Sequence, residues 1–193
     1  ATYFDGRPFY VSPAVLIPRP ETEELVRWAA ESARGQHFLD VGTGSGCIAI
    51  SLKLRRPEVT VHAWDISPEA IDVARKNAES LGADVQFEVQ DLFTAPHKPA
   101  TVVVSNPPYI CEKERAEMAA HVVDFEPTQA LFVPDDDPLR YYKALAQLGA
   151  EEVFVEINAA LRQATADAFR AAGYQQIVCR KDEFGKDRFI YAC

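Results

Sequence analysis

Positive charge is scarce in this chain of 193 residues, which has 20 Lys and Arg against 29 Asp and Glu and a net charge of −9. A large nucleic-acid footprint needs clustered Lys and Arg, so this balance argues against stable binding to DNA or RNA. No apolar run approaches the roughly 18 residues of a membrane span, and the first residues lack the basic and apolar regions of a signal peptide. These absences predict a cytoplasmic protein with no membrane partner.

Cysteine and histidine are also sparse, with 4 residues of each type. The cysteines form no C-x-x-C pair, which favours reduced thiols and disfavours a zinc site. The histidines lie far apart in the pattern, so we expect no metal and no histidine-activated nucleophile. Hydrophobic residues make up 48% of the chain and charged residues 25%, a composition typical of a folded globular domain.

Short apolar runs alternate with segments of helical period, which is typical of βα units on a mostly parallel sheet. The last two apolar runs flank the turn-forming stretch 181–187 and predict an antiparallel hairpin. We therefore expect an α/β fold with a seven-stranded doubly wound sheet. The expected strands are 37–41, 59–65, 85–89, 101–105, 151–157, 175–180 and 188–192, and the expected helices are 22–33, 46–54, 68–81, 138–148 and 160–172.

The chain divides into two parts in this prediction. Residues 1–21 contain Pro8, Pro13, Pro18 and Pro20, too many for a long helix, and are expected to form an extended segment or short hairpin packed on the domain. Residues 22–193 are expected to form that domain. Within it, the acidic segment 112–137 is expected to be an insertion over the carboxyl edge of the sheet.

A glycine-rich turn directly follows the first strand of the expected sheet and opens a helix. Glycines in such a turn let the backbone approach a ligand and leave N–H groups at the start of the helix pointing at it. A purely structural turn is the alternative. The candidate residues are Gly42, Thr43, Gly44, Ser45 and Gly46.

Acidic residues end the next two strands at the same edge. Asp65 can accept hydrogen bonds from both hydroxyls of a ribose, although a capping or solvated Asp would look the same. Asp91 can accept from the exocyclic amino group of adenine, with Leu92 or Phe93 against the ring face. Because open α/β sheets bind ligands at the carboxyl ends of their strands, these features together predict a nucleoside pocket.

The fourth expected strand ends in Asn106-Pro107-Pro108-Tyr109. Two successive prolines stiffen the backbone and leave its carbonyl groups outside any strand ladder. The Asn106 side-chain oxygen and the Pro107 carbonyl can each accept one N–H of a planar NH₂ group, and Tyr109 can pack against that group. Holding a weakly nucleophilic nitrogen in line with an electrophile is a catalytic role.

Together these motifs resemble class I S-adenosylmethionine-dependent amino methyltransferases, which have a Rossmann-like fold. Three further stretches narrow the resemblance to the peptide chain release factor glutamine N5-methyltransferases, the HemK or PrmC family. They are the segment V-L-I-P-R-P-E-T-E at 15–23, the motif Glu126-Pro127-x-x-Ala130-Leu131 and the ending Gly185-Lys186-Asp187-Arg188. The resemblance implies an enzyme that methylates the glutamine amide in the Gly-Gly-Gln loop of a bacterial release factor, with S-adenosyl-L-homocysteine as the second product.

The resemblance also implies roles for single residues. The glycine turn would hold the methionine part of the cofactor, Asp65 the ribose and Leu92 the adenine surroundings. The substrate amide would lie against Asn106, Pro107, Pro108 and Tyr109, and Asn106 would also border the cofactor. The family carries a small helical N-terminal domain that is absent from this sequence, so we expect a trimmed catalytic domain.

Several alternatives stay open at this point. The Asn-Pro-Pro-Tyr motif can also hold a flipped base, so a nucleic-acid amino methyltransferase acting on adenine N6 or guanine N2 is the second hypothesis. A binding module that keeps the pocket without turnover is the third. Near the fifth strand the sequence departs from the family at Asn158, and Glu156 is either a cofactor neighbour or a sheet-end carboxylate. The segment 18–22 is either a proline-braced helix start or a wall of the active site.

Overall fold

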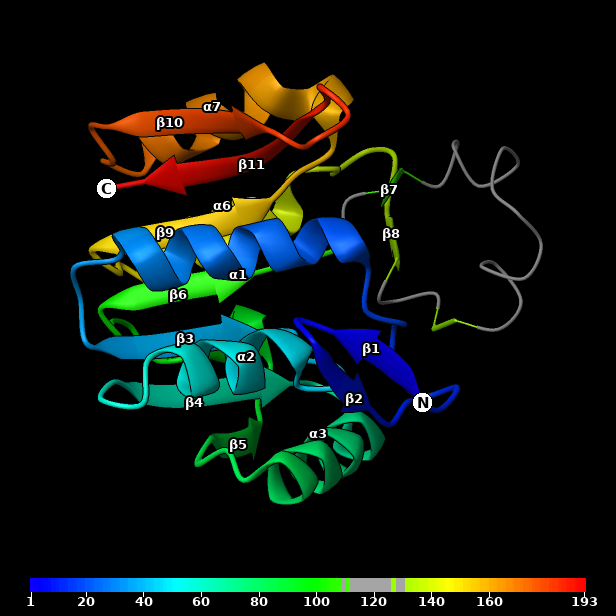
Figure 1. Cartoon of the computed structure of the whole chain (residues 1–193). Helices are drawn as coiled ribbons and strands as arrows, with labels where there is room; N and C mark the ends of the chain where they lie inside the picture. Colours follow the sequence, from blue (N-terminus) through cyan, green and yellow to red (C-terminus); the bar gives the residue numbers. More distant parts are fainter. Residues whose placement is uncertain (109, 112–125, 128–130) are drawn as a thin grey trace.

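A seven-stranded sheet forms the centre of the computed structural model, which describes residues 1–108, 110–111, 126–127 and 131–193. The strand order is β10-β11-β9-β6-β3-β4-β5. Neighbours from β9 to β5 run parallel, whereas β11 is antiparallel to both β9 and β10 (Figure 1). The predicted doubly wound sheet with a C-terminal antiparallel hairpin is therefore confirmed.

The strands of this sheet lie within two residues of the predicted ranges. They are β3 (His37–Val41), β4 (Thr60–Asp65), β5 (Gln86–Val89), β6 (Val102–Ser105), β9 (Glu152–Glu156), β10 (Ile177–Lys181) and β11 (Asp187–Ala192). A separate short parallel pair joins β7 (Ile110–Cys111) to β8 (Phe132–Val133).

Helices cover both faces of the sheet, with α1 to α3 on one face and α6 and α7 on the other (Figure 1). Helix α1 begins two residues before its predicted start because proline is tolerated in the first turn, where its missing N–H has no intrahelical partner. The helices are α1 (Pro20–Ser32), α2 (Cys47–Arg55), α3 (Pro68–Leu81), α6 (Arg140–Gln147) and α7 (Arg162–Ala171), with single 3₁₀ turns η1 (Leu92–Thr94) and η3 (Ala159–Leu161).

The core is split by the sheet into two apolar layers. Along β6, Val102 and Val104 pack in the layer beneath α1 and α2, while Val103 packs in the layer beneath α6 and α7. Strand β9 alternates in the same way, with Phe154 in the first layer and Val153 in the second. Because both faces are covered, the central strands read as continuous apolar runs in the sequence.

The N-terminal segment folds as a short hairpin of β1 (Thr2–Phe4) and β2 (Arg7–Phe9). Phe4 and Phe9 are buried and meet edge to face, with ring centroids 6.1 Å apart. Arg55 of α2 donates to both carboxylate oxygens of Asp5 in the hairpin turn, at 2.6 and 2.8 Å. These contacts attach the hairpin to the rest of the chain, and the division of the chain at residue 22 stays a prediction.

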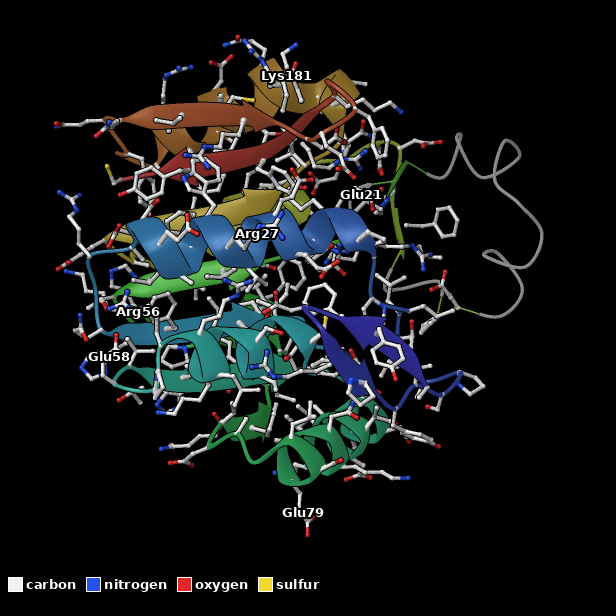
Figure 2. All side chains as sticks on the ribbon, in the orientation of Figure 1. Glu21, Arg27, Arg56, Glu58, Glu79 and Lys181 are labelled. Atoms are coloured by element: carbon white, nitrogen blue, oxygen red, sulfur yellow. The ribbon has the colours of Figure 1, made fainter. Side chains whose placement is uncertain are left out.

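Charged side chains lie on the outer surface, as Figure 2 shows for Arg27 on α1 and Glu79 on α3, which are exposed. Arg56 and Glu58 form an ion pair of 2.8 Å between α2 and β4. Asp135, at the end of the expected insertion, is exposed, while residues 112–125 and 128–130 lie outside the described part of the chain. No helix in the described part combines the length and apolar character needed to cross a membrane.

Candidate active site

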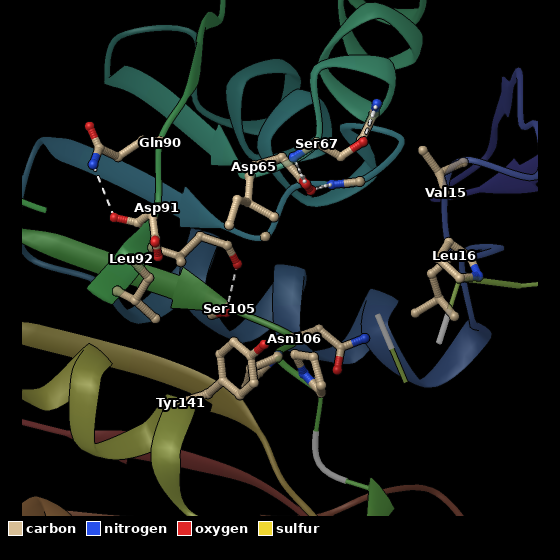
Figure 3. Close-up of a pocket in the computed structure, with 18 of the residues that line it drawn as sticks. Val15, Leu16, Asp65, Ser67, Gln90, Asp91, Leu92, Ser105, Asn106 and Tyr141 are labelled. Carbon is tan, nitrogen blue, oxygen red and sulfur yellow. Dashed lines mark hydrogen bonds between the residues drawn. The ribbon is translucent and has the colours of Figure 1, made fainter. Parts of the chain in front are cut away.

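A cavity of about 180 Å³ opens at the carboxyl ends of the parallel strands (Figure 3). Four loops meet there, one after each of β3, β4, β5 and β6, because parallel strands end at the same edge of a sheet. The N-terminal segment and helix α6 complete the wall. The lining residues are Ala14, Val15, Leu16, Val41, Gly42, Gly44, Asp65, Ile66, Ser67, Ala70, Gln90, Asp91, Leu92, Phe93, Ser105, Asn106, Pro107, Pro108, Pro127 and Tyr141.

The glycine turn after β3 serves two different purposes. Gly42 and Gly44 have φ values of 75° and 54°, and a Cβ added to either would meet nothing within 4 Å, so this part of the backbone is open to a ligand. Gly46 has a φ of 86°, but a Cβ there would lie 2.9 Å from Ile50 and 3.1 Å from Ala74. Gly46 therefore packs the turn against α2 and α3 and does not line the cavity.

The other two predicted turn residues, Thr43 and Ser45, are buried. They line a smaller hollow of about 40 Å³ beside the main cavity, which also contains Thr22, Gly42 and Asn106. Of the five residues predicted as one glycine turn, Gly42 and Gly44 line the main cavity, Thr43 and Ser45 line only the small hollow, and Gly46 lines neither.

Asp65, at the end of β4, joins the glycine turn to the start of α3. Its two carboxylate oxygens accept the N–H groups of Gly44 at 2.9 Å and Ser67 at 3.0 Å (Figure 3). Burial raises the pKa of the Asp65 carboxyl, and these backbone hydrogen bonds oppose the rise. A carboxylate has about four acceptor sites, so both oxygens can still accept hydroxyl groups of a ligand.

The loop after β5 presents Asp91 and Leu92 to the cavity. The Asp91 carboxylate accepts the N–H of Phe93 at 2.9 Å and so caps the turn η1. The ring of Phe93 packs 5.3 Å from that of Tyr141, and the guanidinium of Arg140 lies 4.3 Å from the Phe93 ring. This aromatic contact holds α6 at the edge of the predicted adenine region.

Asn106 follows β6, beside Ser105, whose hydroxyl donates to the carbonyl of Val41 at 2.7 Å. The side-chain amide of Asn106 donates to the hydroxyl of Thr22 at 3.5 Å. Pro107 is buried and Pro108 half-buried, and both line the cavity. The fourth residue of this predicted group, Tyr109, lies outside the described residues.

Asp40, one position before the end of β3, is fully buried beneath the glycine turn. One carboxylate oxygen accepts the hydroxyl of Thr43 at 2.7 Å and the N–H of Ala49 at 3.2 Å, and the other has no hydrogen-bond partner in the described part of the chain. Burial raises the pKa of the Asp40 carboxyl to about 7. Asp40 therefore supports the turn from below and does not line the cavity.

The segment before α1 forms a wall of the cavity and is fastened by Glu126. The buried Glu126 carboxylate accepts the N–H of Ile17 at 2.7 Å and forms an ion pair with Arg19. Pro20 starts α1, which agrees with the helix-start interpretation of residues 18–22. Within that segment Pro18, Arg19 and Thr22 line the small hollow and not the main cavity, so its role as a wall of the active site stays a prediction.

Comparison with known proteins shows which family has this sequence and fold. A family model described as "Methyltransferase small domain" matches residues 22–131. The Release factor glutamine methyltransferase of Bacteroides thetaiotaomicron is 49% identical over 199 residues, which cover 98% of this chain and 72% of that protein. The chain belongs to the release factor glutamine methyltransferase family. The family resemblance predicted from the sequence motifs is thereby confirmed.

Solved structures with lower identity share the fold. The hMettl16 catalytic domain, in complex with the MAT2A 3'UTR hairpin 6, has a TM-score of 0.74 at 15% identity and covers 95% of this chain and 73% of its own. The magnesium protoporphyrin IX methyltransferase (ChlM) from Synechocystis PCC 6803 with bound SAM has a TM-score of 0.60 at 17% identity, covering 88% of this chain and 76% of its own. Both likenesses concern the fold alone.

The sequence of this family member did not predict the contacts of three residues in or beneath the site. Tyr141 reaches the cavity from α6, where its aromatic type gave no signal beyond that of a core residue. Thr22 belongs to a segment expected to be either a helix start or a wall of the active site, and its contact with Asn106 across 84 positions was not predicted. Asp40 precedes the predicted glycine turn in the sequence, and its complete burial was not predicted.

Proposed function

We propose that this chain transfers the methyl group of S-adenosylmethionine to the side-chain amide nitrogen of the glutamine in the Gly-Gly-Gln loop of a bacterial release factor. Asn106 is the observation that carries the proposal, because it places an amide oxygen at the cavity beside a rigid Pro107-Pro108 backbone. The name of this chain's relatives, Release factor glutamine methyltransferase, supports the substrate class. Release factors act on ribosomes, so the proposed location is the cytoplasm.

The residues around the cavity fit S-adenosylmethionine. The open backbone at Gly42 and Gly44 suits the close approach of the methionine part, and the Asp65 carboxylate suits the two ribose hydroxyls. Leu92 and Tyr141 supply apolar surface for a flat base. When bound, S-adenosylmethionine supplies a methyl group attached to a positively charged sulfur.

The chain's own contribution to the reaction is to hold the glutamine amide. Asn106 donates from its NH₂ group to Thr22, so its oxygen is left as an acceptor, and no described residue donates a hydrogen bond to it. That oxygen and the Pro107 carbonyl accept the two hydrogens of the substrate NH₂ group. This arrangement fixes the nitrogen and stabilises the positive charge that develops on it as the new bond forms. The nitrogen then loses one of its two hydrogens to solvent as a proton, which leaves a neutral N-methyl amide.

The direct test incubates the protein with labelled S-adenosylmethionine and a bacterial release factor, followed by mass spectrometry of the Gly-Gly-Gln peptide. We expect one methyl group on the glutamine amide. Bacterial RNA and DNA are incubated in parallel, and label on nucleic acid with none on protein would favour the base methyltransferase instead. The net charge of −9 leads us to expect no such label.

Asn106→Ala tests the assignment of the acceptor. We expect turnover to fall by about 100-fold or more, because a positioned acceptor at the reacting atom is lost, while S-adenosylhomocysteine binding by calorimetry changes by less than about threefold. Gln86→Ala removes an exposed amide side chain from β5 and is the matched control. Full activity in Asn106→Ala would contradict the assignment.

A further inference from the structure

Three polar side chains from distant parts of the sequence form a hydrogen-bonded chain behind the predicted substrate amide. Asn106 donates from its amide nitrogen to the Thr22 hydroxyl at 3.5 Å, and the Thr22 hydroxyl donates to the Glu156 carboxylate at 2.8 Å. Thr22 and Glu156 are each 2% exposed. These contacts are long-range, since 84 and 134 positions of sequence separate the partners.

The fold brings the three together for simple reasons. Strands β6 and β9 are parallel neighbours with Ser105 opposite Val155, so Asn106 and Glu156 follow at the same level of the sheet. Helix α1 runs along β9 and β6 on one face of the sheet (Figure 1), and Thr22 lies in its first turn. The Tyr142 hydroxyl donates to the Glu156 backbone carbonyl at 2.6 Å, which holds the end of β9 in place.

The direction of these hydrogen bonds follows from Glu156, the acceptor at their end. The Thr22 hydroxyl donates its hydrogen to a carboxylate oxygen of Glu156, so the Thr22 oxygen is left to accept. Asn106 must then turn its NH₂ group toward Thr22 and its carbonyl oxygen away from it. Without the carboxylate, the Thr22 hydroxyl could donate to the Asn106 oxygen, and the amide could adopt the reversed orientation.

Orientation of this amide matters for the reaction proposed above. A reversed Asn106 would present N–H groups to the N–H groups of the substrate glutamine and lose the acceptor. We propose that Thr22 and Glu156 are positioning residues that set the amide orientation of Asn106 for methyl transfer; this inference rests on the proposed function. Neither residue needs to touch the reacting atoms, and Thr22 shares only the small hollow with Asn106.

The test compares four single variants and one double variant with the wild-type protein in the release-factor methylation assay. Thr22→Val keeps the shape of the side chain without its hydroxyl, and Thr22→Ser keeps the hydroxyl. Glu156→Gln lets an amide at this position donate to the Thr22 hydroxyl, which reverses the direction of the hydrogen bonds from Asn106 to Thr22 and from Thr22 to residue 156. Thr165→Val is the matched control, because Thr165 is also fully buried but donates to the Leu161 carbonyl in α7, away from the cavity.

We expect kcat to fall by about 10-fold to 100-fold in Thr22→Val and in Glu156→Gln, the range associated with loss of a hydrogen bond to a charged group. S-adenosylhomocysteine affinity and the KM for the release factor should change by less than about threefold. Thr22→Ser should recover most of the wild-type kcat, and Thr165→Val should keep it. The double variant of Thr22→Val with Glu156→Gln should lose little more than either single variant, because both act through the same amide.

The outcomes separate the two proposals. One outcome is that the wild type methylates the release factor while the two single variants, Thr22→Val and Glu156→Gln, each keep kcat within about twofold of it. That result overturns the positioning role and leaves the proposed function standing. A similar loss in Thr22→Ser and Thr22→Val, or a loss that follows cofactor affinity or the unfolding temperature, also overturns it in favour of a packing role. A wild type that leaves the release factor unmethylated overturns both.

Discussion

Replacing Asp40 by asparagine is expected to change how the free energy of unfolding depends on pH. Burial raises the pKa of this carboxyl from 3.8 to about 7, against the opposing hydrogen bonds from Thr43 and Ala49. In the unfolded chain the group titrates near its ordinary value. Between these two values the folded protein holds a proton that the unfolded chain has released. The stabilisation from that proton is complete below about pH 4 and is lost as the pH rises through 7.

The magnitude follows from the size of the pKa change. A tenfold change in an ionisation constant corresponds to about 1.4 kcal/mol, so the full effect of Asp40 is about 4 kcal/mol. Most of the ionisation of Asp40 in the folded protein occurs between pH 5 and pH 8. Over this interval the free energy of unfolding of the wild type should fall by about 3 kcal/mol relative to that of an uncharged replacement. Asp40 is 0% exposed, so solvent screening does not reduce the effect.

Urea unfolding followed by tryptophan fluorescence at pH 5, 6, 7 and 8 measures the difference between wild type and Asp40→Asn. The variant should gain stability relative to the wild type as the pH rises, since only the wild type must ionise a buried carboxyl. Asp84→Asn removes an exposed carboxyl and should show a constant difference across the same range. An Asp40→Asn difference that stays within about 0.5 kcal/mol from pH 5 to pH 8 would refute the reasoning.

Two further predictions concern the turn and the cofactor. Gly46→Ala should lower the free energy of unfolding by about 2 to 4 kcal/mol, because a Cβ at φ 86° is strained and would lie 3.1 Å from Ala74. Gly82→Ala, at φ 68° with nothing within 4 Å, should cost only about 1 kcal/mol. Asp65→Ala should weaken S-adenosylhomocysteine binding by about 10-fold to 100-fold in calorimetry, through loss of hydrogen bonds to the ribose.

Two other substitutions, Gly82→Ala and Asp84→Ala, are the controls for these predictions. Equal losses in Gly46→Ala and Gly82→Ala by urea unfolding would show that packing behind the turn is irrelevant and only the backbone conformation counts. Asp84→Ala should leave cofactor affinity unchanged, because that exposed carboxyl follows the C-terminal end of α3, whereas Ser67 and Ala70 line the cavity at its start. Unchanged affinity in Asp65→Ala as well would remove Asp65 from the ribose site.

The order of elements was predictable because it depends on local patterns. Apolar runs bounded by turns gave every strand of the central sheet, and helix α3 has the predicted range of 68–81. The Ser67 hydroxyl caps this helix by accepting the N–H of Ala70 at 3.2 Å. Helix ends were less predictable. Helix α6 begins at Arg140, two residues after the predicted start at Pro138, because the preceding residues form a turn in place of a first helical turn.

The site was predictable only in part. Gly42, Asp65 and Asn106 carry their own signals, since a glycine turn, an acidic strand end and an Asn-Pro-Pro stretch are visible in the sequence. Tyr141 carries none, because an aromatic residue on a helix is also common in structural roles. Glu156 was noticed at the end of its strand, but the sequence left it either a cofactor neighbour or a sheet-end carboxylate. Their functions depend on neighbours that are remote in the chain.

The sequence by itself therefore determined which segments are strands, helices and turns, and which short motifs stand at the strand ends that line the cavity. These properties depend on side-chain periodicity, proline and glycine, which act over a few residues. The tertiary structure decided that four loops converge on one cavity, that Thr22 meets Glu156 across 134 positions, and that Asp40 titrates near neutral pH. Convergence, long-range contact and burial are properties of packing, and packing is set by the whole chain.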